Sequence, residues 1–166
     1  IYSMPKGWVF LPGVNPKMKY VPERYFPFVL TSEYPDEGQR SFELRCEDEG
    51  AVTIDYGSGN HGIDEIRVLG CAEFEFYDAC MDLEAFTQGG IAVFPEGDID
   101  APMMRLCVYY DGIEMILSDR RPCRHFRCAQ AVFSFDEEGG LAAIHVDNIG
   151  KAFHSHIRSE LFAQDS

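Results

Sequence analysis

Alternation of apolar and polar positions begins near residue 41 and predicts a series of strands. Phe42–Cys46 and Ala51–Tyr56 both alternate and flank the turn residues Glu47–Gly50, a pattern typical of a β-hairpin with one solvated face. The same criteria predict three further strands, at Ile63–Leu69, Ala72–Tyr77 and Ile91–Phe94.

Two more hairpins are predicted in the second half of the chain. Leu106–Tyr110 meets Ile113–Leu117 across Asp111–Gly112, a dipeptide that favours a two-residue type I′ turn. Ala131–Phe135 and Leu141–Val146 form the other hairpin, around the turn residues 136–140. The basic segment between them, residues 118–128, is interpreted as a loop.

Only two segments favour a helix. Asp78 is a suitable N-cap for a short helix that runs to about Gln88, with an apolar stripe of Leu83 and Phe86 and a stop at Gly89. A second helix is expected from Ile149 to Phe162. It is capped by Asn148, and its apolar positions Phe153, Ile157 and Leu161 recur every four residues.

These elements predict an α+β fold: a mostly antiparallel β-sheet of about eight strands, a short middle helix and a C-terminal helix. The chain of 166 residues is expected to form a single domain, residues 1–166. Residues 1–40 contain six prolines among aromatic residues and predict an extended N-terminal segment. A weak likeness between residues 71–78 and 128–136 suggests an internal duplication.

A resemblance to a known group involves residues 106–146. Tyr110-Asp111 followed by Ile116-Leu117, and then Phe135-Asp136 with Gly139, resembles a family of small uncharacterised bacterial β domains built from two such hairpins. The resemblance implies a fold and no activity.

Charge is concentrated in the middle of the chain. The net charge is −14, with 28 acidic and 14 basic residues. Residues 31–101 hold 18 acidic and three basic residues, a net charge of −15, whereas residues 1–30 carry +3 and residues 102–166 carry −2. This balance argues against a protein that follows nucleic-acid phosphates. It fits recognition of a basic partner, or acidic loops that keep the domain soluble.

The favoured function is therefore an acidic protein-binding module that neutralises a basic protein, such as an immunity protein that blocks a nuclease-type toxin domain. Immunity and antitoxin proteins are similar in size and charge only. No contact with nucleic acid or membrane and no cofactor is expected. The candidate contacts are carboxylates in predicted turns: Asp36, Glu37, Glu47, Asp48, Glu49, Glu96, Asp98 and Asp100.

The alternative is an enzyme or small-ligand-binding protein that uses the loop of Cys123, His125 and Cys128, with His61 as a further candidate. Four arginines in that segment disfavour a metal ion, and they could instead dock onto the acidic middle segment. A third interpretation is an adaptor that uses an aromatic N-terminal strip: Trp8, Phe10, Tyr25, Phe26 and Phe28.

Six cysteines are expected to be reduced core thiols, because a chain with this many core residues needs no disulfides. The first six residues lack the long apolar stretch of a signal peptide, so a cytoplasmic protein is expected.

Overall fold

A computed structural model describes residues 4–23, 26–81, 83, 86–150 and 152–164. Fourteen strands and one helix are present in these residues: β1 (Trp8–Pro12), β2 (Met18–Tyr20), β3 (Phe28–Ser32), β4 (Gln39–Cys46), β5 (Gly50–Gly57), β6 (Ile63–Cys71), β7 (Glu73–Phe76), β8 (Gly89–Val93), β9 (Ile99–Asp100), β10 (Arg105–Val108), β11 (Ile113–Ile116), β12 (Arg124–Cys128), β13 (Ala131–Phe135), β14 (Leu141–Val146) and α1 (Ala152–Gln164).

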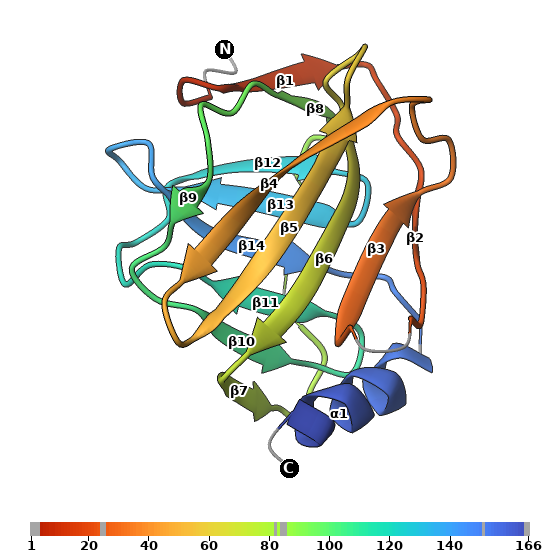
Figure 1. Cartoon of the computed structure of the whole chain (residues 1–166), viewed down its shortest axis with the longest axis vertical. Helices are drawn as coiled ribbons and strands as arrows, with labels where there is room; N and C mark the ends of the chain where they lie inside the picture. The colour runs from red at the N-terminus through yellow and green to blue at the C-terminus, as the bar shows by residue number, and fades with distance from the viewer. Residues whose placement is uncertain (1–3, 24–25, 82, 84–85, 151, 165–166) are drawn as a thin grey trace.

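Two six-stranded sheets face each other. The first has the strand order β2-β3-β6-β5-β4-β9 and the second the order β12-β13-β14-β11-β10-β7. Their strands cross at a steep angle (Figure 1). The two-stranded ribbon β1-β8 lies at one end of the molecule, and α1 lies at the other end beside β7 (Figure 1).

The expected α+β fold with one sheet of about eight strands is wrong. The described residues form a mostly β protein with three sheets and a single, C-terminal helix. The proline-rich segment contributes β1, β2 and β3, and residues interpreted as a basic loop contribute β12. Short strands like these show too few alternating positions to be recognised, and neighbouring strands supply the hydrogen bonds that hold them.

The expected middle helix is also wrong. Residues 78–81, 83 and 86–88 are not helical, and residues 82, 84 and 85 lie outside the described residues. Tertiary contacts explain the difference: the backbone N–H of Met81 donates to the Asp111 carboxylate at 2.8 Å, and the Phe86 ring stacks on His125 at 4.9 Å. Contacts of this kind outweigh the small helix propensity of a short segment.

The three predicted hairpins are confirmed as β4–β5, β10–β11 and β13–β14, all antiparallel. The predicted type I′ turn is wrong. The last paired residues are Val108 and Ile113, and the N–H of Tyr109 donates to the carbonyl of Gly112. Neither Asp111 nor Gly112 has the positive φ that a type I′ turn requires.

The core lies between the two large sheets. Its largest fully buried side chains include Phe28, Leu30 and Ile54 from the first sheet and Phe133 and Phe135 from the second. The C-terminal helix adds Phe153, Ile157 and Leu161, all fully buried, as their spacing predicted. No helix among the described residues has the length and apolar character needed to cross a membrane.

Candidate functional site

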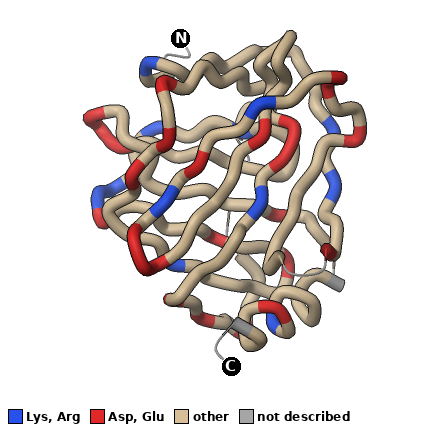
Figure 2. Tube along the Cα trace, in the orientation of Figure 1, with Lys and Arg blue, Asp and Glu red and all other residues tan. Residues whose placement is uncertain are grey.

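Six carboxylates lie on β4, on the β4–β5 turn and on the segment that leads into β9, and we call them the acidic edge: Glu43, Glu47, Asp48, Glu96, Asp98 and Asp100. The parallel pairing of Leu44 with Ile99 and of Arg45 with Asp100 places the segment after β8 alongside β4. Asp98 completes the connection, because its Oδ1 accepts the backbone N–H of Glu43 at 2.9 Å. Acidic positions follow the β4–β5 turn and the segment leading into β9 on one side of the molecule (Figure 2).

Two cations contact the acidic edge. Arg45 lies 3.7 Å from Asp98 and 3.5 Å from Asp100, and the Lys6 ammonium lies 3.1 Å from Glu96. Within the described residues, the carboxylates of Glu43, Glu47 and Asp48 have no ion-pair partner. Six carboxylates and two cations leave a net charge of −4. The acidic edge therefore keeps a negative potential that its own cations do not cancel.

The carboxylates of Asp36 and Glu49, two other predicted contacts, accept hydrogen bonds from within the chain and so stabilise the fold. The Asp36 carboxylate accepts the backbone N–H groups of Gly59 at 3.0 Å, Asn60 at 3.3 Å and Glu37 at 2.8 Å. These hydrogen bonds, that from Gly59 first, lower the pKa of Asp36. Glu49 accepts the backbone N–H of Met104 at 3.1 Å and the thiol of Cys46 at 3.3 Å.

The structure therefore places five of the eight predicted contacts along this edge: Glu47, Asp48, Glu96, Asp98 and Asp100. Glu37 is exposed, but it lies before β4, beyond the opposite end of that strand from the β4–β5 turn. Glu43 was not predicted. It lies within an alternating strand, and only the arrival of β9 beside β4 makes it part of the site.

A pocket of about 620 Å³ opens beside the acidic edge. Its lining is Lys6, Gly7, Trp8, Phe42, Val93, Phe94, Pro95, Glu96, Gly97, Asp98 and Ile99. The volume lies within the range of about 300–1,000 Å³ that is common for ligand sites. Aromatic and aliphatic side chains line most of the pocket, and the three charged residues come from the two loops that flank it.

Backbone pairing builds the aromatic part of this pocket. Trp8 pairs with Val93 in the β1-β8 ribbon, and the N–H of Phe94 donates to the carbonyl of Gly7 at 2.8 Å. Gly7 has φ +91°, and a Cβ there would lie 3.3 Å from the carbonyl oxygen of Phe94, so this close approach requires glycine. The Phe94 ring is 48% exposed and stacks on His61 at 4.3 Å.

The loop of Cys123, His125 and Cys128 does not form one site. Cys128 is buried, and burial raises its pKa to about 11. His125 lies three positions earlier in β12 and faces the other side of the sheet, where its Nδ1 lies 2.7 Å from Ser134 Oγ. Cys123 is exposed before the strand begins. No group of three potential metal ligands forms among the described residues.

Two arginines of this segment pair with nearby acids, and among the described residues none of the four forms an ion pair with the acidic middle segment. Arg120 lies 2.7 Å from Glu138, and Arg127 contacts both carboxylate oxygens of Asp147 at 3.0 and 2.8 Å. All six cysteines are free. Cys71, Cys107 and Cys128 are buried, as expected for core thiols, whereas Cys80 and Cys123 are exposed.

The aromatic N-terminal strip is mostly core. Phe10 and Phe28 are buried, Trp8 and Phe26 are half-buried, and Tyr25 lies outside the described residues. His61, the further ligand candidate, is packed between the rings of Tyr56 and Phe94.

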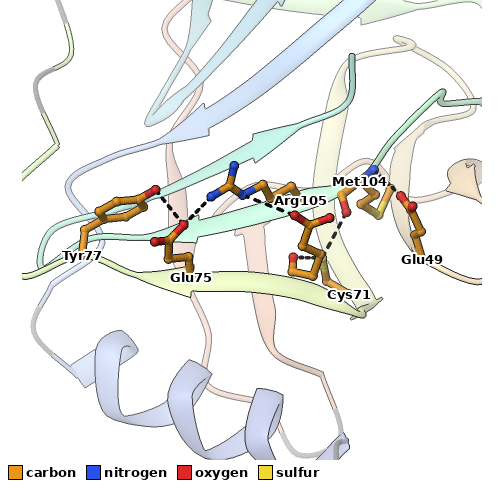
Figure 3. A network of polar contacts seen from close by, with 7 residues as sticks. Glu49, Cys71, Glu75, Tyr77, Met104 and Arg105 are labelled. Carbon is orange, nitrogen blue, oxygen red and sulfur yellow. Dashed lines mark hydrogen bonds and ion pairs between the residues drawn. The ribbon is translucent and has the colours of Figure 1, made fainter. Parts of the chain in front are cut away.

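One polar network was not predicted from the sequence. Arg105 pairs with Glu73 and Glu75, and the Tyr77 hydroxyl donates to Glu75 at 2.9 Å (Figure 3). The hydrogen bond to Glu75 raises the pKa of Tyr77 to about 12. The parallel pairing of β7 with β10 brings these side chains together, and no local pattern in the sequence predicts that pairing.

A second unpredicted contact joins His145 to Glu114, at 2.7 Å on adjacent strands. His145 lies in β14, an interior strand of its sheet, and its side chain is 14% exposed.

The chain matches no family model and no curated protein. The resemblance of residues 106–146 to small bacterial β domains therefore stays a prediction.

Proposed function

We propose that this protein is a binding module for a basic protein partner and that the acidic edge is its contact surface. The observation that carries the proposal is a row of six carboxylates along β4, its turn and the β9 segment, two of which, Glu96 and Asp98, line the apolar pocket. A negative surface of this kind steers a basic partner into place and speeds its association. The phosphate-binding lysines and arginines of a nuclease-type toxin domain are one such partner surface.

The arrangement of charge and apolar surface also supports a protein partner over a small inorganic cation. Protein interfaces combine a polar rim with a desolvated apolar centre. Here the acidic edge supplies the rim, and the pocket lined by Trp8, Phe42 and Phe94 supplies apolar surface next to it.

Charge reversal at the acidic edge tests the proposal. The variant carries Glu47→Lys and Asp48→Lys, both exposed and without an ion pair in the described part of the chain. The control carries Glu23→Lys and Glu33→Lys, which change the net charge equally but lie at the ends of β2 and β3, the opposite edge of the same sheet. A partner is captured at low and high salt, identified, purified and titrated against each protein.

We expect one basic protein, bound less tightly at high salt, with an affinity about tenfold lower for the edge variant than for the control. Equal affinity of the two variants, or an affinity that does not change with salt, would contradict the proposal.

A further inference from the structure

We infer that the pocket beside the acidic edge accepts an arginine side chain of the partner. This inference rests on the proposed function and names the group that the partner inserts. It is supported by the aromatic lining of the pocket and by the charges at its mouth.

The lining suits the flat face of a guanidinium group. Trp8 is half-buried and packs edge to face on Phe42, with ring centroids 6.2 Å apart. It also packs edge to face with Phe135, with ring centroids 5.3 Å apart. Tryptophan is the strongest cation–π partner among the aromatic side chains, and arginine stacks on such rings more often than lysine does. Arginine is also enriched among the residues that dominate binding energy at interfaces.

The mouth of the pocket already holds a cation from the same chain. The Lys6 ammonium lies 3.1 Å from Glu96, and the two side chains are 91% and 82% exposed. An ion pair this exposed contributes little to stability, so an incoming guanidinium can displace Lys6. The guanidinium would gain a bidentate contact with the Glu96 carboxylate, which the ammonium cannot form.

Asp98 adds to the negative potential at the mouth without being free to move. Its Oδ1 accepts the backbone N–H of Glu43, and its Oδ2 lies 3.7 Å from Arg45. Glu96 is therefore the carboxylate that contacts the arginine, and Asp98 acts through its charge.

Other occupants fit less well. A phosphate or a nucleic acid would meet the carboxylates of Glu96 and Asp98. A second copy of this chain would bring another net charge of −14 against the acidic edge, which opposes self-association there. A neutral apolar group would fill the lining but gain nothing from the charged mouth.

The fluorescence of Trp8 can report binding, because Trp8 is the only tryptophan in the chain and it lines the pocket. The probe is a short uncharged peptide with one central arginine, titrated while Trp8 fluorescence is recorded. The matched control peptide carries citrulline, which keeps the shape of arginine and removes its charge. We expect a saturable change in emission with the arginine peptide and an affinity at least about tenfold lower for citrulline.

Two surface variants test the exchange at the mouth. Glu96→Gln removes the contact and should weaken the arginine peptide by about threefold, whereas Lys6→Gln removes the competing cation and should strengthen it by a similar factor. Both side chains are exposed, so matching thermal unfolding midpoints would show that the fold is kept. A purely structural role for Lys6 would not produce tighter binding.

The inference is overturned if Trp8 shows no saturable response to the arginine peptide, if citrulline binds equally well, or if Lys6→Gln leaves the affinity unchanged. Equal binding of citrulline would assign the pocket to an apolar side chain. A partner whose affinity falls in the Glu47→Lys, Asp48→Lys variant while the arginine peptide fails would refute this inference and leave the proposed function standing.

Discussion

Asp98 accepts a hydrogen bond from the backbone N–H of Glu43 at 2.9 Å, across 55 positions of the sequence. One carboxylate thus attaches the segment after β8 to β4 of the first sheet. The acidic edge and the mouth of the pocket both depend on this attachment, because β9 adds only two paired residues of its own.

Replacing Asp98 with alanine should therefore loosen the β9 segment. We expect Asp98→Ala to lower the free energy of unfolding by about 1–2 kcal/mol, because it removes the acceptor for the Glu43 N–H. Asp98→Asn keeps an acceptor oxygen and should retain most of the stability. Urea unfolding of the three proteins measures the difference, and equal losses for the two variants would show that the hydrogen bond is unimportant.

Asp36 should make stability depend on pH. Three backbone N–H groups, that of Gly59 first, lower the pKa of Asp36 in the folded protein. A carboxyl whose folded pKa is depressed contributes stability above its unfolded pKa, about 3.9, and loses that contribution as pH falls through the folded pKa. The excess stability of the wild type over Asp36→Asn should therefore be largest near neutral pH and shrink on acidification.

Asp64 should make stability depend on pH in the opposite direction. Its side chain is buried, and burial raises its pKa in the folded protein. Its contribution is present below the unfolded pKa and is lost as pH rises through the folded pKa. Asp64→Asn should therefore gain stability relative to the wild type as pH rises. Unfolding by urea at a series of pH values checks both carboxyls, and parallel curves for the two variants would contradict the assignment.

Gly89→Ala should disrupt the ribbon that carries Trp8. A Cβ at Gly89 would lie 2.6 Å from Phe10 Cζ and 2.7 Å from the backbone carbonyl of Leu11, so β1 and β8 would have to separate. We expect a loss of about 1–3 kcal/mol and a shift in Trp8 fluorescence. Gly62→Ala is the control, because its Cβ would meet nothing closer than 3.4 Å. A fluorescence shift of the same size in both variants would refute this explanation.

Two arginine–carboxylate pairs near the second sheet should contribute different amounts to stability because they are buried to different extents. Arg127 and Asp147 are 14% and 25% exposed and form two hydrogen bonds, whereas Arg120 and Glu138 are 55% and 73% exposed. Asp147→Ala should cost about 1–3 kcal/mol, because a poorly solvated guanidinium loses its partner. Glu138→Ala should cost about 0–1 kcal/mol. Thermal unfolding ranks the two variants, and equal shifts would show that burial does not matter here.

The hairpins were predictable because their information is local. In β4–β5, alternation runs through both strands and a polar turn joins them, so pairing follows from residues that are close in sequence. The 109–112 turn shows the limit of local rules. Asp111 uses its carboxylate for the N–H of Met81, a distant residue, and the expected type I′ geometry does not form.

Most of the acidic edge was predicted from the sequence, because its carboxylates lie in predicted turns of the acidic segment: Glu47, Asp48, Glu96, Asp98 and Asp100. Asp36 and Glu49 met the same criteria, yet their carboxylates accept backbone N–H groups within the fold. Sequence shows that a carboxylate is present in a turn. Which hydrogen-bond donors lie near it depends on segments that arrive from elsewhere in the chain.

Local sequence patterns were enough to predict the strand-rich segments, the C-terminal helix with its buried stripe of Phe153, Ile157 and Leu161, and the concentration of negative charge in residues 31–101. Three features required the folded chain: the division into two large crossing sheets, the placement of β9 beside β4 and the pocket lined by Trp8, Phe42 and Phe94. Periodicity and charge are properties of neighbouring residues. Strand pairing between distant segments is chosen by the total burial and hydrogen bonding of the whole chain.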